Sequence, residues 1–194
     1  MLIADRFIFI HFPKTGGTFV TKVLEEYLNA HGYPCKRITI NLLIPHTSEI
    51  YGQHGGCNEI RRGWETSRVL LSIRRNPYDI YVSQYEFEWW KRQPKVDPNI
   101  IRKDFPDFPN LTFEQFLHLK NSLFRNKILG DRKLKIDIGI HTLQFIRFFF
   151  KNPYKTIEKI DLNYIEHGEY LNDMHPVTFL RTESLNKDLH DFLL

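Results

Sequence analysis

The hydrophobic pattern of the chain changes its period close to the N-terminus. Residues 7–10 (Phe-Ile-Phe-Ile) form a short run of β-prone apolar side chains, which is typical of a strand covered on both faces. From Gly17 the apolar residues recur at helical spacing until "HGYP" (31–34) ends the run. The residues that carry this spacing are Phe19, Val20, Val23, Leu24, Tyr27 and Leu28. The pattern predicts a strand, a loop and a helix, which is the first part of a βαβ unit.

A second strand and helix follow in the predicted pattern. The apolar run "RVLLSI" (68–73) indicates another buried strand, and "RRNP" ends it. Asn76 suits the N-cap of a helix, Pro77 suits its first turn, and Asp79 adds a negative charge that favours a helix N-terminus. We expect this helix to continue to about Lys91.

The remaining segments extend the alternation of helices and strands. Residues 93–111 contain four prolines and are expected to form a surface loop, whereas 112–115 (Thr-Phe-Glu-Gln) resemble a capping box that opens a short helix. We expect a helix over 139–151, a buried strand over 177–180, and a helix from about Ser184. This alternation predicts an α/β fold with a largely parallel sheet, in which ligands bind at the carboxyl ends of the strands.

Composition narrows the class of protein. With 194 residues, 42% of them hydrophobic and 26% charged, the chain is expected to form one domain over 1–194. A net charge of +4 suits an anionic ligand but is much weaker than the charge of a nucleic-acid-binding protein, so no nucleic-acid partner is expected. Cys35 and Cys57 do not form a C-x-x-C pair, which argues against a zinc site or a disulfide framework and favours two reduced thiols.

No segment has the length and composition of a signal peptide or a membrane span. The N-terminal apolar run reaches a charge within five residues, and the apolar segment 143–150 is short and interrupted by Arg147. We therefore expect a soluble cytoplasmic protein, or a catalytic fragment of a larger one. The sequence makes no prediction of oligomeric state.

The loop "PKTGGT" carries the residues expected of an anion site. Gly16 and Gly17 let the backbone approach a ligand and point its N–H groups inward, and the helix that follows adds its N-terminal partial positive charge. Lys14 supplies a full charge, while Thr15 and Thr18 supply hydroxyl donors. The pattern favours a phosphate-like ligand, although the standard spacing G-x-x-x-x-G-K-[ST] is absent. The alternative is a strand-to-helix turn that uses glycine for its geometry.

A second candidate anion site follows the second predicted strand. Arg75 ends that strand, and Ser83 comes eight residues later. Ser83 lies seven residues beyond the expected N-cap Asn76, close to two helical turns, so the two share a helix face. An arginine and a hydroxyl near one face can bind a second phosphate group. The alternative is a surface arginine and a solvated serine.

The two segments "FIFIHFPKTGGTFV" and "VLLSIRRNPYDIYVSQY" closely resemble the signature segments of the sulfotransferases that use 3′-phosphoadenosine 5′-phosphosulfate (PAPS). The resemblance implies a three-layer P-loop-type fold with a central, mostly parallel β-sheet flanked by helices. It implies PAPS as co-substrate, 3′-phosphoadenosine 5′-phosphate (PAP) as product, and no metal. Arg75 and Ser83 then bind the 3′-phosphate, and the first segment binds the 5′-phosphosulfate. The first segment contributes Lys14, Thr15, Gly16, Gly17, Thr18 and Phe19.

The resemblance extends to the C-terminal segment and has three departures. "VTFLRTESLNKDLHDFL" is similar to the strand and Glu-x-Leu helix of the family. Ile80 replaces the second arginine of the second motif, and Arg74 occupies a position where the family has an apolar strand residue. The chain also stops at Leu194, where relatives continue into a segment that helps to cover the nucleotide, so the resemblance implies a minimal form or one truncated at the C-terminus. We prefer Arg75 over Arg74 as the phosphate ligand because it keeps the eight-residue spacing to Ser83.

Sulfuryl transfer to a hydroxyl needs positive charge at the leaving phosphate and a base at the acceptor. Lys14 suits the first role. His54, in "YGQHGG", resembles the catalytic histidine of sulfotransferases that act on glycan hydroxyls, and its side chain can accept a proton near neutral pH. A glycine-flanked surface histidine is the alternative for His54. Other candidate bases are His46, Glu59 and Glu65, whereas His11 is expected to pack in the core.

The resemblance thus implies a sulfotransferase that acts on a hydroxyl acceptor, and we favour a carbohydrate or glycoconjugate over a protein tyrosine as that acceptor. The aromatic segment "YEFEWW" (85–90) could stack on sugar rings, and Lys91 and Arg92 could contact an anionic acceptor, although core packing is the stronger interpretation of the aromatics. Trp89 and Trp90 are adjacent, so at least one of them is expected to be partly exposed. The alternatives are a P-loop small-molecule kinase and a non-catalytic nucleotide-binding protein.

Overall fold

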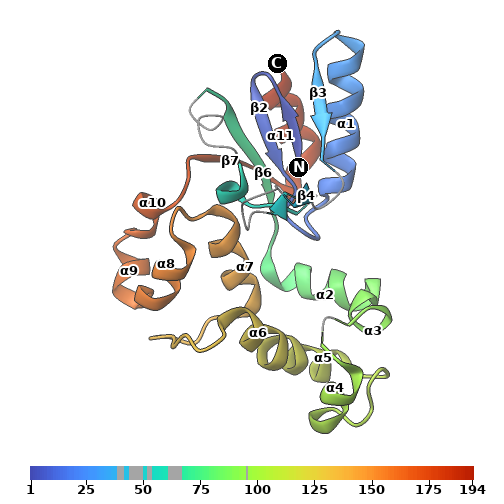
Figure 1. Cartoon of the computed structure of the whole chain (residues 1–194). Helices are drawn as coiled ribbons and strands as arrows, with labels where there is room; N and C mark the ends of the chain where they lie inside the picture. Colours follow the sequence, from blue (N-terminus) through green and yellow to red (C-terminus); the bar gives the residue numbers. More distant parts are fainter. Residues whose placement is uncertain (39–41, 44–49, 52–53, 61–66, 95) are drawn as a thin grey trace. The chain divides into compact units, whose positions relative to one another are not determined.

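A computed structural model describes the chain except for residues 39–41, 44–49, 52–53, 61–66 and 95 (Figure 1). The chain forms two compact units. The first comprises Met1–Arg75, Phe148–Lys151 and Asn172–Leu194, and the second comprises Asn76–Arg147 and Asn152–Leu171. The expectation of one domain over 1–194 stays a prediction.

The first unit contains a five-stranded sheet in the order β3-β1-β2-β6-β7. The three strands expected from the sequence are present as β2 (Phe7–Ile10), β6 (Val69–Arg74) and β7 (Val177–Arg181), and they are parallel to their neighbours in this group. Two further strands are β1 (Leu2–Ala4) and β3 (Cys35–Arg37). A separate antiparallel pair joins β4 (Leu42–Leu43) and β5 (Ile50–Tyr51).

The expectation of a mostly parallel sheet is wrong, because the five-stranded sheet is mixed. β1 pairs antiparallel with both β2 and β3. Only Asp5 and Arg6 separate β1 from β2, and such a short connection allows only antiparallel neighbours. β3 then runs in the same direction as β2, with β1 between them. The fold is therefore α/β with a mixed sheet flanked by helices.

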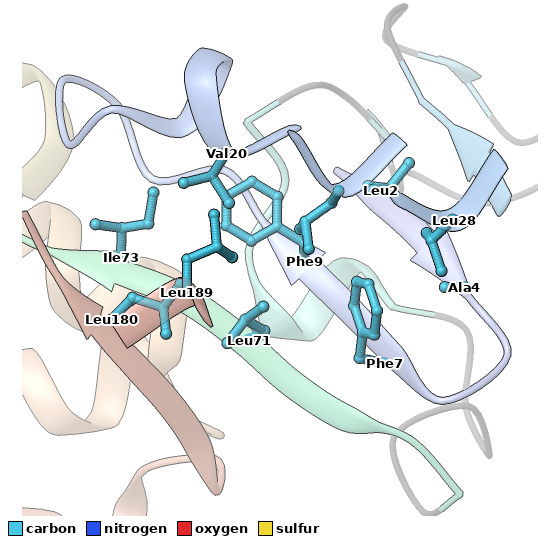
Figure 2. Packing of buried hydrophobic residues seen from close by; sticks show 11 residues of the cluster. Leu2, Ala4, Phe7, Phe9, Val20, Leu28, Leu71, Ile73, Leu180 and Leu189 are labelled. Carbon is cyan, nitrogen blue, oxygen red and sulfur yellow. The ribbon is translucent and has the colours of Figure 1, made fainter. Parts of the chain in front are cut away.

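One face of this sheet carries the core of the first unit. The helices α1 (Gly17–Ala30) and α11 (Leu185–Leu193) pack their apolar side chains against it, and Figure 2 shows that these side chains meet the strand residues in a single cluster. Each large side chain buried there contributes about 1.5–3 kcal/mol to stability. The cluster contains Leu2, Ala4, Phe7, Phe9, Val20, Leu24, Leu28, Leu71, Ile73, Leu180 and Leu189. The expected helices at 17–30 and after Ser184 are confirmed.

Aromatic side chains pack together in another part of the first unit. Phe12, two residues after β2, contacts the rings of Phe148 and Phe149 at 4.9 and 5.5 Å between centroids. Phe149 in turn meets Phe179 of β7 edge to face at 5.0 Å. The Asn58 amide, in the 3₁₀ turn Cys57–Glu59, donates to the carbonyl of Phe150 at 2.6 Å. These contacts connect the segment Phe148–Lys151 to the residue Phe12 after β2, to β7 and to the turn Cys57–Glu59.

The second unit contains a series of helices. Its own core joins Trp90, Ile101, Phe108, Leu111, Phe116 and Leu119. The helices between β6 and β7 are α2 (Pro77–Phe87), α3 (Trp89–Arg92), α4 (Pro98–Asp104), α5 (Phe113–Leu119), the π-helical turn Lys120–Phe124, α6 (Arg125–Leu129), α7 (Ile140–Phe149), α8 (Pro153–Lys159), α9 (Leu162–Glu166) and α10 (Tyr170–Asp173). The last two residues of α7 and of α10 belong to the first unit. The expected helix over 139–151 is confirmed as α7, and the expected capping box is confirmed at Thr112 and Gln115.

Two expectations for this unit are wrong in part. The helix expected to reach Lys91 is interrupted at Glu88, whose φ of 58° lies in the left-handed region. The segment 93–111, expected to be a loop, contains α4, because Asp97 caps the helix and Pro98 occupies a first-turn position where proline is well tolerated. The expectation that at least one tryptophan is exposed is confirmed, since Trp89 is 48% exposed and Trp90 is buried.

Candidate anion-binding site

The two predicted ligand loops begin at the same edge of the sheet. β2 and β6 are parallel, with Ile10 opposite Ser72, and the buried Ser72 hydroxyl donates to the Ile10 carbonyl at 2.8 Å. Their carboxyl ends therefore lie side by side. The loop from residue 11 to 16 leaves the end of β2, and Arg75 follows the end of β6.

The backbone of the first loop holds two left-handed residues. Gly16 has a φ of 91°, which glycine adopts freely, while Lys14 has a φ of 66°. A left-handed conformation costs a residue such as lysine roughly 1–2 kcal/mol, so other contacts must hold the loop in this shape. One such contact is made by Thr15, whose fully buried hydroxyl donates to the Phe12 carbonyl at 2.8 Å. The Thr15 hydroxyl thus shapes the loop, and its contact with a ligand stays a prediction.

The N-terminus of α1 is well suited to an anion. Gly16 is its N-cap, no side chain caps it, and its first turn contains no acidic residue. The first N–H groups of a helix have no intrahelical acceptor, so they are available to a ligand. Thr18 and Phe19 are exposed on this first turn, as a ligand contact would require. The N-terminus of α2 differs, because the Asn76 side chain accepts from the Tyr78 N–H at 3.0 Å.

Arg75 lies directly against the first loop. Its Nη1 donates to the carbonyl of Lys14 at 3.1 Å. Burial, and then the charge of Arg75, lower the pKa of Lys14 below its ordinary value. The loop thus brings a lysine and a guanidinium close enough to repel each other, and a bound anion would offset that repulsion. Arg74 is exposed and lies opposite Arg181 in the parallel pair β6–β7.

His11 is buried, as expected, and its ring leaves no room for a side chain at position 17. Its ring lies against the α-carbon of Gly17, so that a β-carbon built on Gly17 would be 2.1 Å from the ring. Gly17 is therefore required by a close approach of two groups in the protein. Its φ is not in the left-handed region, unlike that of Gly16.

His54 lies beside His11 at the start of the loop. Its ring meets the His11 ring edge to face at 4.8 Å, and its Nδ1 lies 3.1 Å from the His11 carbonyl oxygen. A carbonyl can only accept, so Nδ1 carries the proton when the ring is neutral. The lone pair of the neutral ring is then on Nε2. His54 is exposed, and this tautomer is the one a general base needs.

We expect the burial of His11 to make stability depend on pH. Burial, followed by the charge of His54, lowers the pKa of His11 from 6.5 to about 3. The stabilisation is therefore complete above pH 6.5 and is lost as the pH falls toward 3, by at most about 1.4 kcal/mol per pH unit. Burial likewise lowers the pKa of His141 to about 4. Urea unfolding between about pH 8 and pH 4.5 measures the slope, and His11→Asn should reduce it. An unchanged slope in that variant would contradict the assignment.

Of the other candidate bases, only Glu59 lies among the described residues. The Glu59 carboxylate accepts from the Gly56 N–H at 3.2 Å, so it is engaged in the turn that precedes Ile60. His46 and Glu65 lie outside the described residues. Ser83 is half-buried on α2, in the second unit, and its part in phosphate binding stays a prediction.

The aromatic and basic residues proposed for the acceptor also lie in the second unit. Trp89 and Phe87 are about half exposed, with their rings 6.1 Å apart. Lys91 and Arg92 both pair with Glu88, at 2.6 and 3.1 Å. Their charges are therefore directed in part at a neighbouring carboxylate, and their contact with an acceptor stays a prediction.

Sequence reasoning missed Thr182 as a component of this region. Its hydroxyl lies 3.0 Å from the Thr15 carbonyl and 3.0 Å from the Arg74 carbonyl. The sequence held a sign of this role. Thr182 comes two residues after the predicted strand 177–180, and the carboxyl end of a parallel strand is where ligands bind. Its polar side chain was not connected with the other two loops.

Comparison with known proteins gives no match: no family model, no curated protein and no solved structure is similar to the chain.

In the described part of the chain, no three His, Cys, Asp or Glu side chains are grouped as metal ligands would be. No helix among the described residues has the length and apolar character needed to cross a membrane. Cys35 and Cys57 are both free thiols, and burial raises the pKa of Cys57 to about 12.

Proposed function

We propose that the protein is a PAPS-dependent sulfotransferase with a P-loop-type fold that transfers a sulfuryl group to a hydroxyl of a carbohydrate or glycoconjugate, in the cytoplasm. The observation that carries the proposal is the contact of Arg75 with the backbone of Lys14, beside a helix N-terminus that has no capping side chain. The charge of Lys14, the guanidinium of Arg75 and the first N–H groups of α1 support the binding of an anion at this loop. The sequence motifs favour PAPS among anionic ligands.

The proposed reaction assigns a role to each group. The acceptor oxygen attacks sulfur in line, a new S–O bond forms, and the S–O bond to the 5′-phosphate of PAPS breaks. Lys14 and the N–H groups of Gly16, Gly17 and Thr18 stabilise the charge that grows on the leaving phosphate. His54 Nε2 takes the proton of the acceptor hydroxyl. Arg75 binds the 3′-phosphate.

Nucleotide binding tests this proposal without knowledge of the acceptor. We expect PAP to bind more tightly than ATP in calorimetric titrations at one fixed salt concentration. Arg75→Ala should weaken PAP binding by about 10- to 100-fold, because a hydrogen bond between charged groups is lost. Arg74→Ala removes the same charge from the adjacent residue, and we expect it to change the PAP affinity much less.

The outcomes separate the candidate functions. Equal or tighter binding of ATP would contradict the proposal and favour a kinase. PAP preference without transfer of labelled sulfate to any hydroxyl acceptor in a screen would favour a non-catalytic nucleotide-binding protein. An equal loss of affinity in the Arg74 and Arg75 variants would show a general charge effect and would remove the specific role of Arg75.

A further inference from the structure

Thr182 connects two segments that are far from it in the sequence. It begins the 3₁₀ turn Thr182–Ser184 that joins β7 to α11. Its Oγ1 lies 3.0 Å from the carbonyl oxygen of Thr15 and 3.0 Å from that of Arg74, which are 167 and 108 residues away. The hydroxyl has one proton, and rotation about the Cβ–Oγ1 bond directs it to either carbonyl while the oxygen stays in place.

Both acceptors are next to residues of the anion site. Thr15 stands between Lys14 and Gly16, and Arg74 directly precedes Arg75. The Thr182 hydroxyl therefore lies within hydrogen-bond distance of the residues that adjoin Lys14 and Arg75, the two cations of the proposed site. The Arg75–Lys14 hydrogen bond is a second connection between the same two segments.

The position of Thr182 is itself well fixed. The preceding residue, Arg181, forms a two-pronged contact with the Asp188 carboxylate, at 2.9 Å from Nε and 2.7 Å from Nη2, and its backbone N–H donates to the same group at 2.8 Å. Ser184 also donates to Asp188, at 3.0 Å. Paired contacts of this kind between arginine and carboxylate restrict orientation as well as distance. The turn that carries Thr182 is thus held to α11 on both sides.

A packing contact supports the same arrangement. A β-carbon built on Gly16 would lie 3.4 Å from Cδ2 of Leu185, the first residue of α11. The first residue of α11 therefore packs against the loop, next to the turn that carries Thr182. The loop is left-handed at both Lys14 and Gly16, and a backbone of this kind persists only when its surroundings hold it.

We propose that Thr182 is a positioning residue that fixes the anion loop relative to the strand end that carries Arg75. Its hydroxyl sets the separation between the Lys14 backbone and the arginine, and so the size of the anionic ligand that both can contact. The identity of that ligand as PAP rests on the proposed function. The positioning role itself depends only on the contacts of the protein.

The test compares three variants. Thr182→Val keeps the shape of the side chain but removes its hydrogen bond, Thr182→Ser keeps the hydroxyl, and Thr178→Val makes the same change at an exposed position of β7. We expect Thr182→Val to weaken PAP binding by about 5- to 10-fold, Thr182→Ser to bind like the unchanged protein, and Thr178→Val to have no effect. All four proteins should have similar melting temperatures.

A second measurement needs no ligand. We expect the backbone ¹⁵N order parameters of Gly16 and Gly17 to fall from about 0.85 toward 0.6 in Thr182→Val and to stay unchanged in Thr182→Ser. If the unchanged protein fails to bind PAP, the proposed function fails, and the order parameters still decide the role of Thr182. Unchanged affinity together with unchanged order parameters in Thr182→Val would overturn the inference. If that variant does not fold, Thr182→Ala replaces it with the same expected results.

Discussion

Replacing Gly17 with alanine is expected to destabilise the protein, by about 1–3 kcal/mol. The new β-carbon would lie 2.1 Å from Cδ2 and 2.5 Å from Nε2 of His11, which is closer than atoms can approach. His11 is only 5% exposed, so its ring has little room to move away. Alanine favours a helix over glycine by about 1 kcal/mol, which is too little to offset this overlap. A change of 1 kcal/mol corresponds to a shift of about 2–4 °C in the melting temperature of a chain of this size.

Two further variants identify the cause of this loss. Thr18→Ala changes the next residue of the same helix at an exposed site, and we expect its stability to stay within about 0.5 kcal/mol of the original. In a double-mutant cycle, Gly17→Ala should cost much less in a His11→Ala background, since the ring is then absent. Equal costs in both backgrounds, measured by urea unfolding, would show that the His11 ring is not what requires glycine.

Loss of His54 is expected to have the largest effect on turnover. His54→Ala should lower the rate of sulfuryl transfer by about 10²- to 10⁴-fold, because the acceptor proton loses its base. The affinity for PAP should change little. The His54 ring contacts His11, whereas the proposed phosphate-binding groups lie in the loop that follows His11. The measurement is transfer of labelled sulfate from PAPS to an acceptor identified by a screen, with PAP titration of the same preparations.

His31 provides a matched control for this experiment. It is also exposed, and its Nδ1 also lies close to a backbone carbonyl, that of Tyr27 at 2.8 Å. It stands just beyond the C-terminal end of α1, whereas the anion loop precedes the N-terminal end of that helix. His31→Ala should leave the turnover unchanged. A similar loss in both variants would point to a general effect on folding, and full turnover in His54→Ala would remove His54 from the reaction.

Local sequence patterns predicted the elements whose structure depends on residues that are close together in the chain. The strand Phe7–Ile10 and the helix from Gly17 to Ala30 follow from the period of their apolar residues. The N-cap Asn76 and the capping box at Thr112 follow from side chains that bond to backbone two or three residues away. Elements that are very short escaped prediction, because the three residues of β1 are too few to show a period.

The prolines of the segment 93–111 were taken to exclude a helix, and this interpretation was wrong for one of them. The segment 93–111 contains four prolines and was expected to be a loop, yet Pro98 opens α4 and Asp97 accepts from the Asn99 N–H at 2.8 Å. Proline in a first turn removes an N–H that would have no partner in any case. An aspartate directly before a proline was the signal that could have revealed this helix.

The sequence by itself determined the candidate chemistry: a lysine and two glycines at the start of one helix, and an arginine after the next buried strand. Tertiary structure decided how these residues meet. It placed Arg75 against the Lys14 carbonyl, His54 beside His11, and the Thr182 hydroxyl between two distant carbonyls. Periodicity and caps act within a few residues, whereas these contacts join segments 43 to 167 residues apart. Their geometry follows from the order of the strands, which sheet pairing and core packing set across the whole first unit.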